Sequence, residues 1–471
     1  MADTKQRFDS EANKVYTYSD VETLINELKD LADMVDHHQT KQVPRLSELD
    51  DYYLGNNKTI LEGQRRKEEH MADHRATHNY ARYISQFVVG YLTGKPIAVA
   101  HTDEKAQETI DAIKKTNDID AINSEIELDC SVYGRAYEMV LRSQDDEDRV
   151  FLLSPLQTFV IYDNTVEQKP IAGVRYWNEK IKDEDTRVVN LYTHQNIYTY
   201  HAVEGDLSIQ EGPKPHGFGG VPINEYQNNR FRQGDFENVL SLIDLYDAAQ
   251  SDLANYSQDL QDAMLVIKGR LELENSSDDP IEQAKKMKQA NILYMEPEMS
   301  SDGKEGKIDA GYIYKEYDVE GSEAYKNRLD NDIHKYTAIP NMSDEKFGGQ
   351  QTGEAMKYKL FALEQVRATK ERYFKRSLRN RYRLINNMKT KASELAEDLL
   401  KDITIEFTPN FPKNTKEEID IFNSLGGEVS NETKLKVFPY EVDIEEEQER
   451  IEEERKRRRQ ASTSAYMNAE N

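Results

Sequence analysis

The sequence has a single cysteine, Cys130, among its 471 residues. One thiol cannot form a disulfide within the chain or supply a multi-cysteine zinc cluster, so the composition fits a reducing cytoplasm. Long hydrophobic runs are also missing, because the longest, around Phe87–Leu92, is far shorter than the roughly 20 residues that span a bilayer. The first ten residues, MADTKQRFDS, contain no apolar core of signal-peptide length. We therefore expect a soluble protein that is not exported through a signal peptide.

No complete catalytic motif is present either. Gly348 and Gly353 have the glycine spacing of a phosphate-binding loop. The next residues, Glu354 and Ala355, stand where lysine and serine or threonine are required to hold phosphates and magnesium. Because an acid there would repel a nucleotide, we interpret the segment as a connector between two helices, with Thr352 as N-cap of the second. With no GxSxG pattern and no obvious partner for the cysteine, we expect a protein that is not an enzyme and binds no cofactor.

Three histidines recur at every fourth residue, His70, His74 and His78, a spacing that would place them on one face of a helix. Ligands on three successive turns cannot converge on one metal ion, and no HExxH glutamate accompanies them. We therefore favour a polar or subunit-facing surface over a metal site.

Two other patterns have the wrong residues for a ligand site. The glycines within 217–220 resemble a dinucleotide-binding turn, but Pro222 occupies the position of the third glycine. The acidic clusters 145–148 and 276–279 lack the alternating ligands and the closing glutamate of a calcium loop. Solvated turns explain both clusters.

The chain has an excess of acidic residues. Its 88 Asp and Glu outnumber 62 Lys and Arg, which gives a net charge of -26 and a pI near 4.9. This charge counts against tight wrapping of nucleic acid, because such affinity comes from Lys and Arg that neutralise phosphates. A surface past which DNA slides without sticking would carry this sign of charge. The length predicts two or more modules, and 28 Tyr and 14 Phe argue against wholesale disorder.

Hydrophobic spacing predicts an α-rich N-terminal part followed by a β module. Apolar residues at helical spacing indicate helices over 21–35, 44–54, 80–91, 103–115 and 119–128. Residues 19–22 have the composition of a capping box, and Gly55 is positioned to end the second helix. Over 132–200, short Val-, Ile- and Tyr-rich runs alternate with polar turn clusters, which is typical of an antiparallel meander. We interpret the Gly- and Pro-containing segment 212–222 as a linker.

The second half is predicted to be mainly helical. We expect a helix over 235–264, an irregular region with a few strand-like runs over 265–317, and a helix over 322–336. After Gly353, apolar residues continue at helical spacing without a further Gly or Pro, which predicts one helix over 353–389, roughly 55 Å long. Its opposite face is basic and could bind phosphates or form ion pairs between subunits: Arg367, Lys370, Lys375, Arg376, Arg379 and Arg383. The tail is predicted to form a short strand over 403–407, a helix over 414–425 and a charged helix over 440–460.

Five stretches of the chain form a further pattern. They are NYARYISQFVVGYLTGKPIAV (79–99), DCSVYGRAYEMV (129–140), LLSPLQTFVIYD (152–163), FGGVPINEYQNNRFRQGDFENVLSLIDLYDAAQSDLAN (218–255) and IPNMSDEKFGGQQTGEAMKYKLFALE (339–364). In this order they resemble the portal proteins of tailed bacteriophages, in particular the type found in long-tailed siphophages of Gram-positive hosts. The resemblance covers about residues 56–411.

The resemblance implies an α+β, mostly helical portal fold that assembles as a ring. Such a fold has wing, stem, clip and crown regions, with an antiparallel β module in the wing and long stem and wing helices. On this sequence the implied parts are an N-terminal helical segment 1–55, a wing 56–234, a stem helix 235–264, a clip 265–321, a second stem helix 322–340, a tunnel loop 341–352, a long wing helix 353–389, a crown 390–460 and a disordered tail 461–471.

The resemblance also implies where DNA is met. In the family the tunnel loop projects toward the DNA, which implies these channel residues: Asp344, Glu345, Lys346, Phe347, Gly348, Gly349, Gln350 and Gln351. Glycine lowers the cost of unusual backbone angles, so such a loop can follow passing DNA. We hypothesise that Lys346, beside Asp344 and Glu345, gives the loop a weak, exchangeable phosphate contact. No catalytic, cofactor-binding or metal-binding residue is implied.

The implied function is that of a portal, a dodecameric ring at one capsid vertex through which double-stranded DNA is packaged and ejected. Its partners would be further copies of the chain, the DNA, the large subunit of an ATP-driven terminase, the major capsid and scaffold proteins and a head-to-tail adaptor, with no membrane. It would be assembled in the host bacterial cytoplasm and remain in the virion. One alternative is a minor capsid or head-completion protein, which predicts a monomer or small oligomer. The other is a packaging enzyme, which requires an acidic metal cluster or a phosphate loop.

Overall fold

The computed structural model describes residues 6–63, 72–181, 184–203, 206–261, 264–268, 292–295, 309–313, 318–342, 358–394 and 398–410, together with 447, 450–451, 453–454 and 456–457. By its internal contacts the chain divides into two compact units. The first comprises residues 1–341 and 362–409, and the second comprises 342–361 and 410–471. Most of the second unit lies outside the described residues, so the elements below belong to the first unless stated otherwise.

The antiparallel meander expected over 132–200 is divided between two sheets, and its strands from Thr158 onward form the greater part of a six-stranded sheet. Among the described strands the order is β1-β5-β6-β7-β8-β9, and all neighbours are antiparallel except β1, which pairs in parallel with β5. Their bounds are β1 Tyr16–Tyr18, β5 Thr158–Asp163, β6 Pro170–Ile181, β7 Glu184–Tyr192, β8 Asn196–Val203 and β9 Asp206–Pro215. The segment 1–55 is therefore not wholly helical. A three-residue strand is too short to show a period of two in the sequence.

The interpretation of 212–222 as a linker is wrong for its first part. Strand β9 continues through Gly212 and Pro213 to Pro215. It is the outer strand of the sheet, and its register with β8 shifts near Pro213. Proline is tolerated at such an outer, irregular position because no ladder hydrogen bond is lost there.

Two short helices, α1 (Val21–Asn26) and α2 (Leu28–His37), pack on this sheet, and Leu24 and Leu31 are buried against residues such as Phe159. The helix expected over 21–35 is thus interrupted at Glu27, whose backbone angles are φ -98° and ψ 68°. The N-cap of α1 is Asp20, whose side chain accepts a hydrogen bond from Thr23 N at 2.7 Å.

The other helices expected in the N-terminal half all form. Their bounds are α3 Val43–Leu54, α5 Tyr80–Leu92, α6 Glu104–Asn117 and α7 Ile119–Tyr133, with a π-helical turn His38–Gln42 before α3 and a short α4 Lys58–Leu61 after it. Gly55 ends α3 with φ 86°, a left-handed angle that glycine adopts at low cost.

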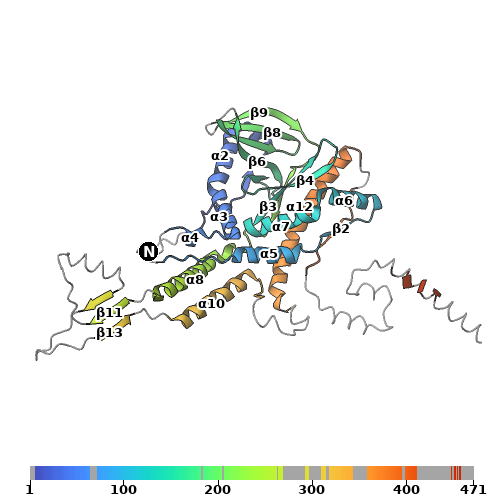
Figure 1. The fold of residues 1–471 in the computed structure, drawn as a ribbon. Helices are drawn as coiled ribbons and strands as arrows, with labels where there is room; N and C mark the ends of the chain where they lie inside the picture. The colour runs from blue at the N-terminus through green and yellow to red at the C-terminus, as the bar shows by residue number, and fades with distance from the viewer. Residues whose placement is uncertain are drawn as a thin grey trace, which may run out of the picture. The chain divides into compact units, whose positions relative to one another are not determined.

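A second, three-stranded sheet packs against α7. Strands β3 (Arg135–Arg142) and β4 (Asp148–Leu153) form a hairpin, and β10 (Ile223–Gln227) pairs with β3, all antiparallel. A long helix, α12 (Phe361–Lys391), contributes buried side chains to the same core: Phe374, Leu378, Tyr382, Leu384 and Ile385. Figure 1 shows α12 beside β3, β4 and α7.

Helix α12 ends at Lys391, two residues after the end expected at 389. The strand expected over 403–407 forms as β14 (Thr404–Glu406), antiparallel to β2 (Ala98–Ala100). Ile405 is buried in one cluster with Phe374. The expected helix over 414–425 and tail over 461–471, and most of the charged helix over 440–460, lie outside the described residues.

The two expected stem helices are α8 (Leu240–Gln261) and α10 (Val319–Thr337). The first is shorter than the expected 235–264, because a 3-10 turn precedes it and Met264 begins a strand. The second starts inside the expected clip, where Asp318 caps it by accepting a hydrogen bond from Gly321 N at 2.8 Å. Within the range expected for the clip and just before it, the structure has β11 Met264–Lys268, β12 Ile292–Met295 and β13 Asp309–Ile313, in the order β12-β11-β13.

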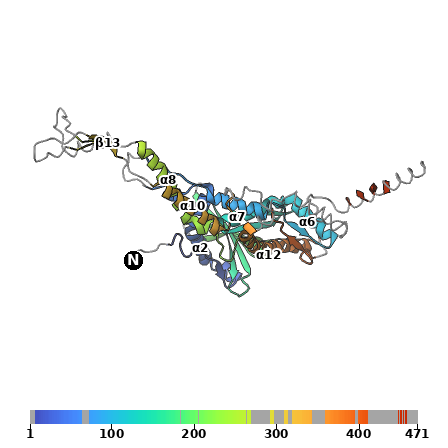
Figure 2. The ribbon, with the colours of Figure 1, turned by 90° about the horizontal axis from the view of Figure 1, so that it is seen from below.

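Helices α8 and α10 lie side by side, as Figures 1 and 2 both show. Asn238, just before α8, donates to the carbonyl of Tyr336 at 3.0 Å, and Lys326 donates to Gln250 at 2.7 Å. Residue numbers rise along one helix as they fall along the other, so the pair is antiparallel.

The single helix expected over 353–389 is interrupted. Leu360 lies in a turn, and α12 begins at Phe361. Residues 353–357 lie outside the described residues.

Candidate functional site

Every residue expected to meet DNA lies outside the described residues. These are Asp344, Glu345, Lys346, Phe347, Gly348, Gly349, Gln350 and Gln351. The described helices on either side of this loop are α10 and α12, and α8 packs against α10.

The segment 72–79 is extended and lies along α8, so the helix suggested by the histidine spacing is wrong for His74 and His78; His70 lies outside the described residues. Side chains at every fourth residue of α8 accept hydrogen bonds from backbone N–H groups at every second residue of the segment: Asp247 from His78 at 2.8 Å, Ser251 from Ala76 at 2.9 Å and Asn255 from His74 at 2.6 Å. Four helical residues rise about 6 Å and two extended residues about 6.6 Å, so the two repeats stay in step.

His78 also contacts α8 through its imidazole ring. Its Nδ1 lies 2.9 Å from Asp247 Oδ1, and the other carboxylate oxygen accepts from Asn57 Nδ2 at 2.9 Å. Within the described ranges, no group of three or more His, Cys, Asp or Glu side chains could hold a metal ion. His74 and His78 thus help to attach the segment 72–79 to α8.

Lys370 of α12 lies in a buried network of ion pairs with α7 and with the segment just before α8. Its Nζ is 2.7 Å from Glu127 Oε1 on α7 and 2.8 Å from Asp235 Oδ2, just before α8. The lysine was expected on an exposed basic face, but its side chain is only 4% exposed. Burial alone would lower the pKa of Lys370, but the two carboxylates raise it above its ordinary value. Burial raises the pKa of Glu127 to about 6.

The rest of the expected basic face divides into paired and unpaired residues. Arg367 and Lys375 form ion pairs with Glu371 of the same helix at 2.5 and 2.6 Å. The others are exposed, and no carboxylate of the described residues lies within ion-pair distance of them: Arg376, Arg379 and Arg383.

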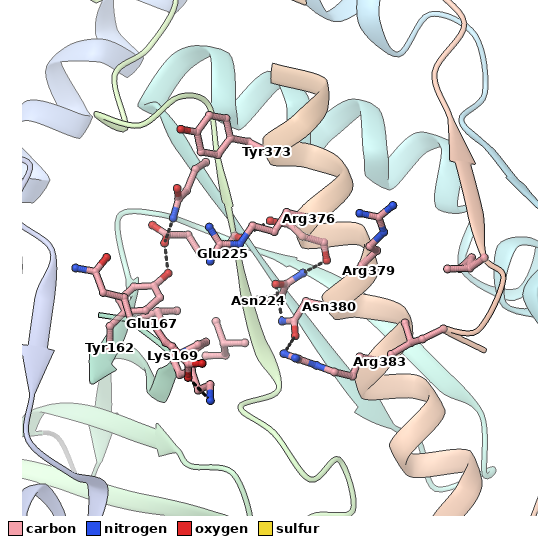
Figure 3. A pocket seen from close by; sticks show the side chains of 18 residues that line it. Tyr162, Glu167, Lys169, Asn224, Glu225, Tyr373, Arg376, Arg379, Asn380 and Arg383 are labelled. Carbon is pink, nitrogen blue, oxygen red and sulfur yellow. Dashed lines mark hydrogen bonds and ion pairs between the residues drawn. The ribbon is translucent and has the colours of Figure 1, made fainter. Parts of the chain in front are cut away.

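These three arginines line a cavity of about 620 Å³ that is bounded by α12, β10 and the turn between β5 and β6 (Figure 3). Lys169 of that turn lies across from the helix, and Asn224 of β10 lies between them. In Figure 3 the side chains of Arg376 and Arg383 extend from α12 toward the side on which Asn224 and Lys169 lie. Part of the lining is apolar: Val160, Ile223, Leu400 and Ile403.

The acidic residues of the cavity are already paired. Glu225 accepts two hydrogen bonds from Arg232, from Nε at 2.8 Å and from NH2 at 2.9 Å, and another from the hydroxyl of Tyr162. Burial would raise the pKa of Glu225, but Arg232 outweighs burial and holds it at about 2. Glu167 pairs with Lys169. The uncompensated charge in the cavity is therefore positive.

Comparison with known proteins identifies the class. The family model described as "Phage portal protein, SPP1 Gp6-like" matches residues 32–461. The chain belongs to this family of phage portal proteins. It is 24% identical to the portal protein of Bacillus phage SPP1 over 401 residues, which cover 82% of this chain and 76% of that protein. It is 23% identical to the portal protein of Clostridium phage phiCD119 over 420 residues, which cover 84% and 89%.

A solved structure described as "Neck of empty GTA particle computed with C6 symmetry" is 12% identical, with a TM-score of 0.40, over 77% of this chain and 89% of that chain. The resemblance to portal proteins of siphophages of Gram-positive hosts is confirmed by the family match and both curated relatives. The α+β fold with long helices is confirmed as well. Portal proteins are structural components of the phage virion. None of the described helices combines the length and apolar character needed to cross a membrane.

Proposed function

We propose that this portal protein assembles as a ring of twelve copies at one capsid vertex and forms the channel for packaging and ejecting double-stranded DNA. The ring docks the large subunit of terminase during packaging and the head-to-tail adaptor afterwards, and contacts the major capsid and scaffold proteins around it. Because the sequence has no complete nucleotide-binding motif, the energy for packaging comes from the ATP-driven terminase. Assembly takes place in the host bacterial cytoplasm.

The observation that carries this proposal is a pair of exposed apolar side chains on the helices α8 and α10. Leu245 on α8 and Tyr325 on α10 are 47% and 45% exposed and line a shallow cavity of about 460 Å³ with Ala248 and Ala249, and its lining also includes Asp252 and Asp318. Large side chains beside small ones are the shape that lets helices of neighbouring copies interlock. A contact repeated head to tail between copies gives a ring when the rotation from one copy to the next closes.

The charge of the chain agrees with a channel. Each copy carries a net charge of -26, so twelve copies form a strongly acidic wall that repels DNA phosphates and lowers friction. The loop over 341–352 would then supply the DNA contacts, with Lys346 as an exchangeable phosphate contact. Phage that carry Lys346→Ala should package DNA more slowly or in lower yield, and normal packaging would refute this role of Lys346.

The assembly is tested by measuring the mass of the purified full-length protein by light scattering and its shape by negative-stain electron microscopy. Rings with a central hole and a mass near twelve subunits are expected. A monodisperse monomer at physiological salt, also in the presence of scaffold protein, would contradict the ring and favour a head-completion protein. Sustained ATP turnover by the pure protein would instead indicate a packaging enzyme.

A further inference from the structure

We propose that the arginine-lined cavity beside α12 binds an acidic peptide segment of a partner protein. The carboxylates of the peptide pair with Arg376, Arg379 and Arg383, and an apolar side chain of the peptide covers the apolar part of the lining. The site lies within the first unit of one chain, so it does not depend on the number of subunits in a ring.

The first argument is the unbalanced charge. Arg376 and Arg383 are seven residues apart, which is about 10 Å along a helix, with Arg379 between them. Like charges three or four residues apart on a helix destabilise it. On the same helix, Arg367 and Lys375 have acidic partners. The three arginines of the cavity have none among the described residues, so a bound anion would relieve their repulsion.

The second argument is the floor of the cavity. Asn380 Nδ2 donates to Asn224 Oδ1 at 2.8 Å, and Arg383 donates to Asn380 Oδ1. With Glu225 held by Arg232, the polar groups of the floor are occupied by one another. The guanidinium groups of Arg376 and Arg379 and the remaining N–H groups of Arg383 are thus left to bind a ligand, and their planar forks suit bidentate pairing with carboxylates.

The third argument separates a peptide from DNA. A cavity of about 620 Å³ has the size that holds a few side chains, and Ile223 and Leu400 give it an apolar wall. The backbone of a DNA duplex presents phosphates but no apolar group that would cover this wall. The net charge of -26 disfavours the binding of DNA and of acidic peptides to the chain as a whole, whereas the cavity has an excess of positive charge.

The test uses the full-length protein and a fluorescein-labelled peptide of alternating glutamate and leucine, followed by fluorescence anisotropy. The double variant Arg376→Ala/Arg383→Ala should bind the peptide at least tenfold more weakly. The matched control is Arg372→Ala, which removes an exposed arginine of the same helix that does not line the cavity, and its affinity should stay within twofold of the unmodified protein. A peptide with glutamine in place of glutamate should not bind.

Three results would overturn the proposal. The first is no binding of the acidic peptide at concentrations up to about 1 mM. The second is an equal loss of affinity in Arg372→Ala and in the double variant, which would indicate general attraction to basic residues. The third is binding of a labelled DNA duplex instead of the peptide, with that binding lost in the double variant, which would assign the cavity to nucleic acid. Circular dichroism of each variant verifies that the fold is retained.

Discussion

Arg381 and Glu138 form an ion pair in which both side chains are completely buried. Nε and NH2 of Arg381 lie 2.8 and 2.6 Å from Glu138 Oε2, and NH1 donates to Asn123 at 2.9 Å. The other oxygen of Glu138 accepts from Asn224 and Tyr226 at 2.8 and 2.9 Å. Each charge thus has several partners, which a buried ion pair requires in order to be stable. The pair fastens α12 to strand β3.

Substitution Arg381→Met should lower the free energy of unfolding by about 3 to 5 kcal/mol, because Glu138 would remain as an unpaired buried charge. The double substitution Arg381→Met/Glu138→Leu should cost less than the single one. Urea unfolding followed by circular dichroism measures both. Arg372→Ala, on the exposed side of the same helix, is the control and should change stability by no more than about 0.5 kcal/mol. A similar loss in the control and the single variant would contradict this role of the pair.

The helices and the meander could be predicted from the sequence because each has a local period. The partners of buried charges could not. Lys370 was placed on an exposed face because its spacing matched that of the exposed arginines, yet Glu127, 243 residues away, pairs with it in the core. The histidine spacing failed for a related reason. In the structure, every second residue of this segment bonds to every fourth residue of α8, so that His74 and His78 bond to Asn255 and Asp247, eight residues apart.

The candidate site was predicted only in part. The loop over 341–352 was inferred from the family resemblance and stays a prediction. The cavity was missed, although the sequence contains a signal for it. Arg367 has glutamates three residues before and four residues after it, whereas no acidic residue stands three or four positions from Arg376, Arg379 or Arg383. This signal excludes partners on the same helix only, because Arg381 also lacks acidic neighbours at helical spacing and pairs with Glu138 in the core.

Gly134→Ala should destabilise the fold severely. The residue has φ 82°, and a Cβ atom would lie 2.1 Å from the carbonyl oxygen of Arg232, which is backbone and cannot move aside. The left-handed angle and this clash together should cost about 2 kcal/mol or more. Gly90→Ala is the matched control, because Gly90 lies inside helix α5 with nothing within 4 Å of its Cβ position. It should stabilise by about 0.5 to 1 kcal/mol. Thermal unfolding of both variants measures the contrast, and equal effects would refute it.

The free energy of unfolding should decrease as the pH falls, because His38 is buried in its neutral form. Its ring stacks on Phe159 and its Nδ1 lies 2.7 Å from the hydroxyl of Tyr176. Burial lowers the pKa of His38 to about 3, from an ordinary value of 6.5. The unfolded chain takes up a proton here as pH falls below about 6.5, whereas the folded chain does so only near pH 3. Protonation therefore favours unfolding in this window, by about 2 kcal/mol between pH 7 and pH 5.

The measurement for His38 is urea unfolding at pH 7 and pH 5, followed by the fluorescence of Trp177, the one tryptophan of the chain, which lies in strand β6 beside Tyr176. His38→Gln should lose about 2 kcal/mol less than the unmodified protein over this interval. An identical pH dependence in the two proteins would show that His38 is not the group responsible.

Leu245→Glu should prevent ring assembly. Leu245 is 47% exposed on α8 and faces the shallow cavity that it forms with Tyr325 of α10. A carboxylate there would have to be buried at every contact between copies, which is costly for an unpaired charge and is repeated around the ring. Light scattering should therefore give a monomer where the unmodified protein gives a ring. Val166→Glu is the control, since Val166 is fully exposed in the turn between β5 and β6, and it should leave the mass unchanged. Rings formed equally by both variants would place the contact between copies elsewhere than on this face of the stem.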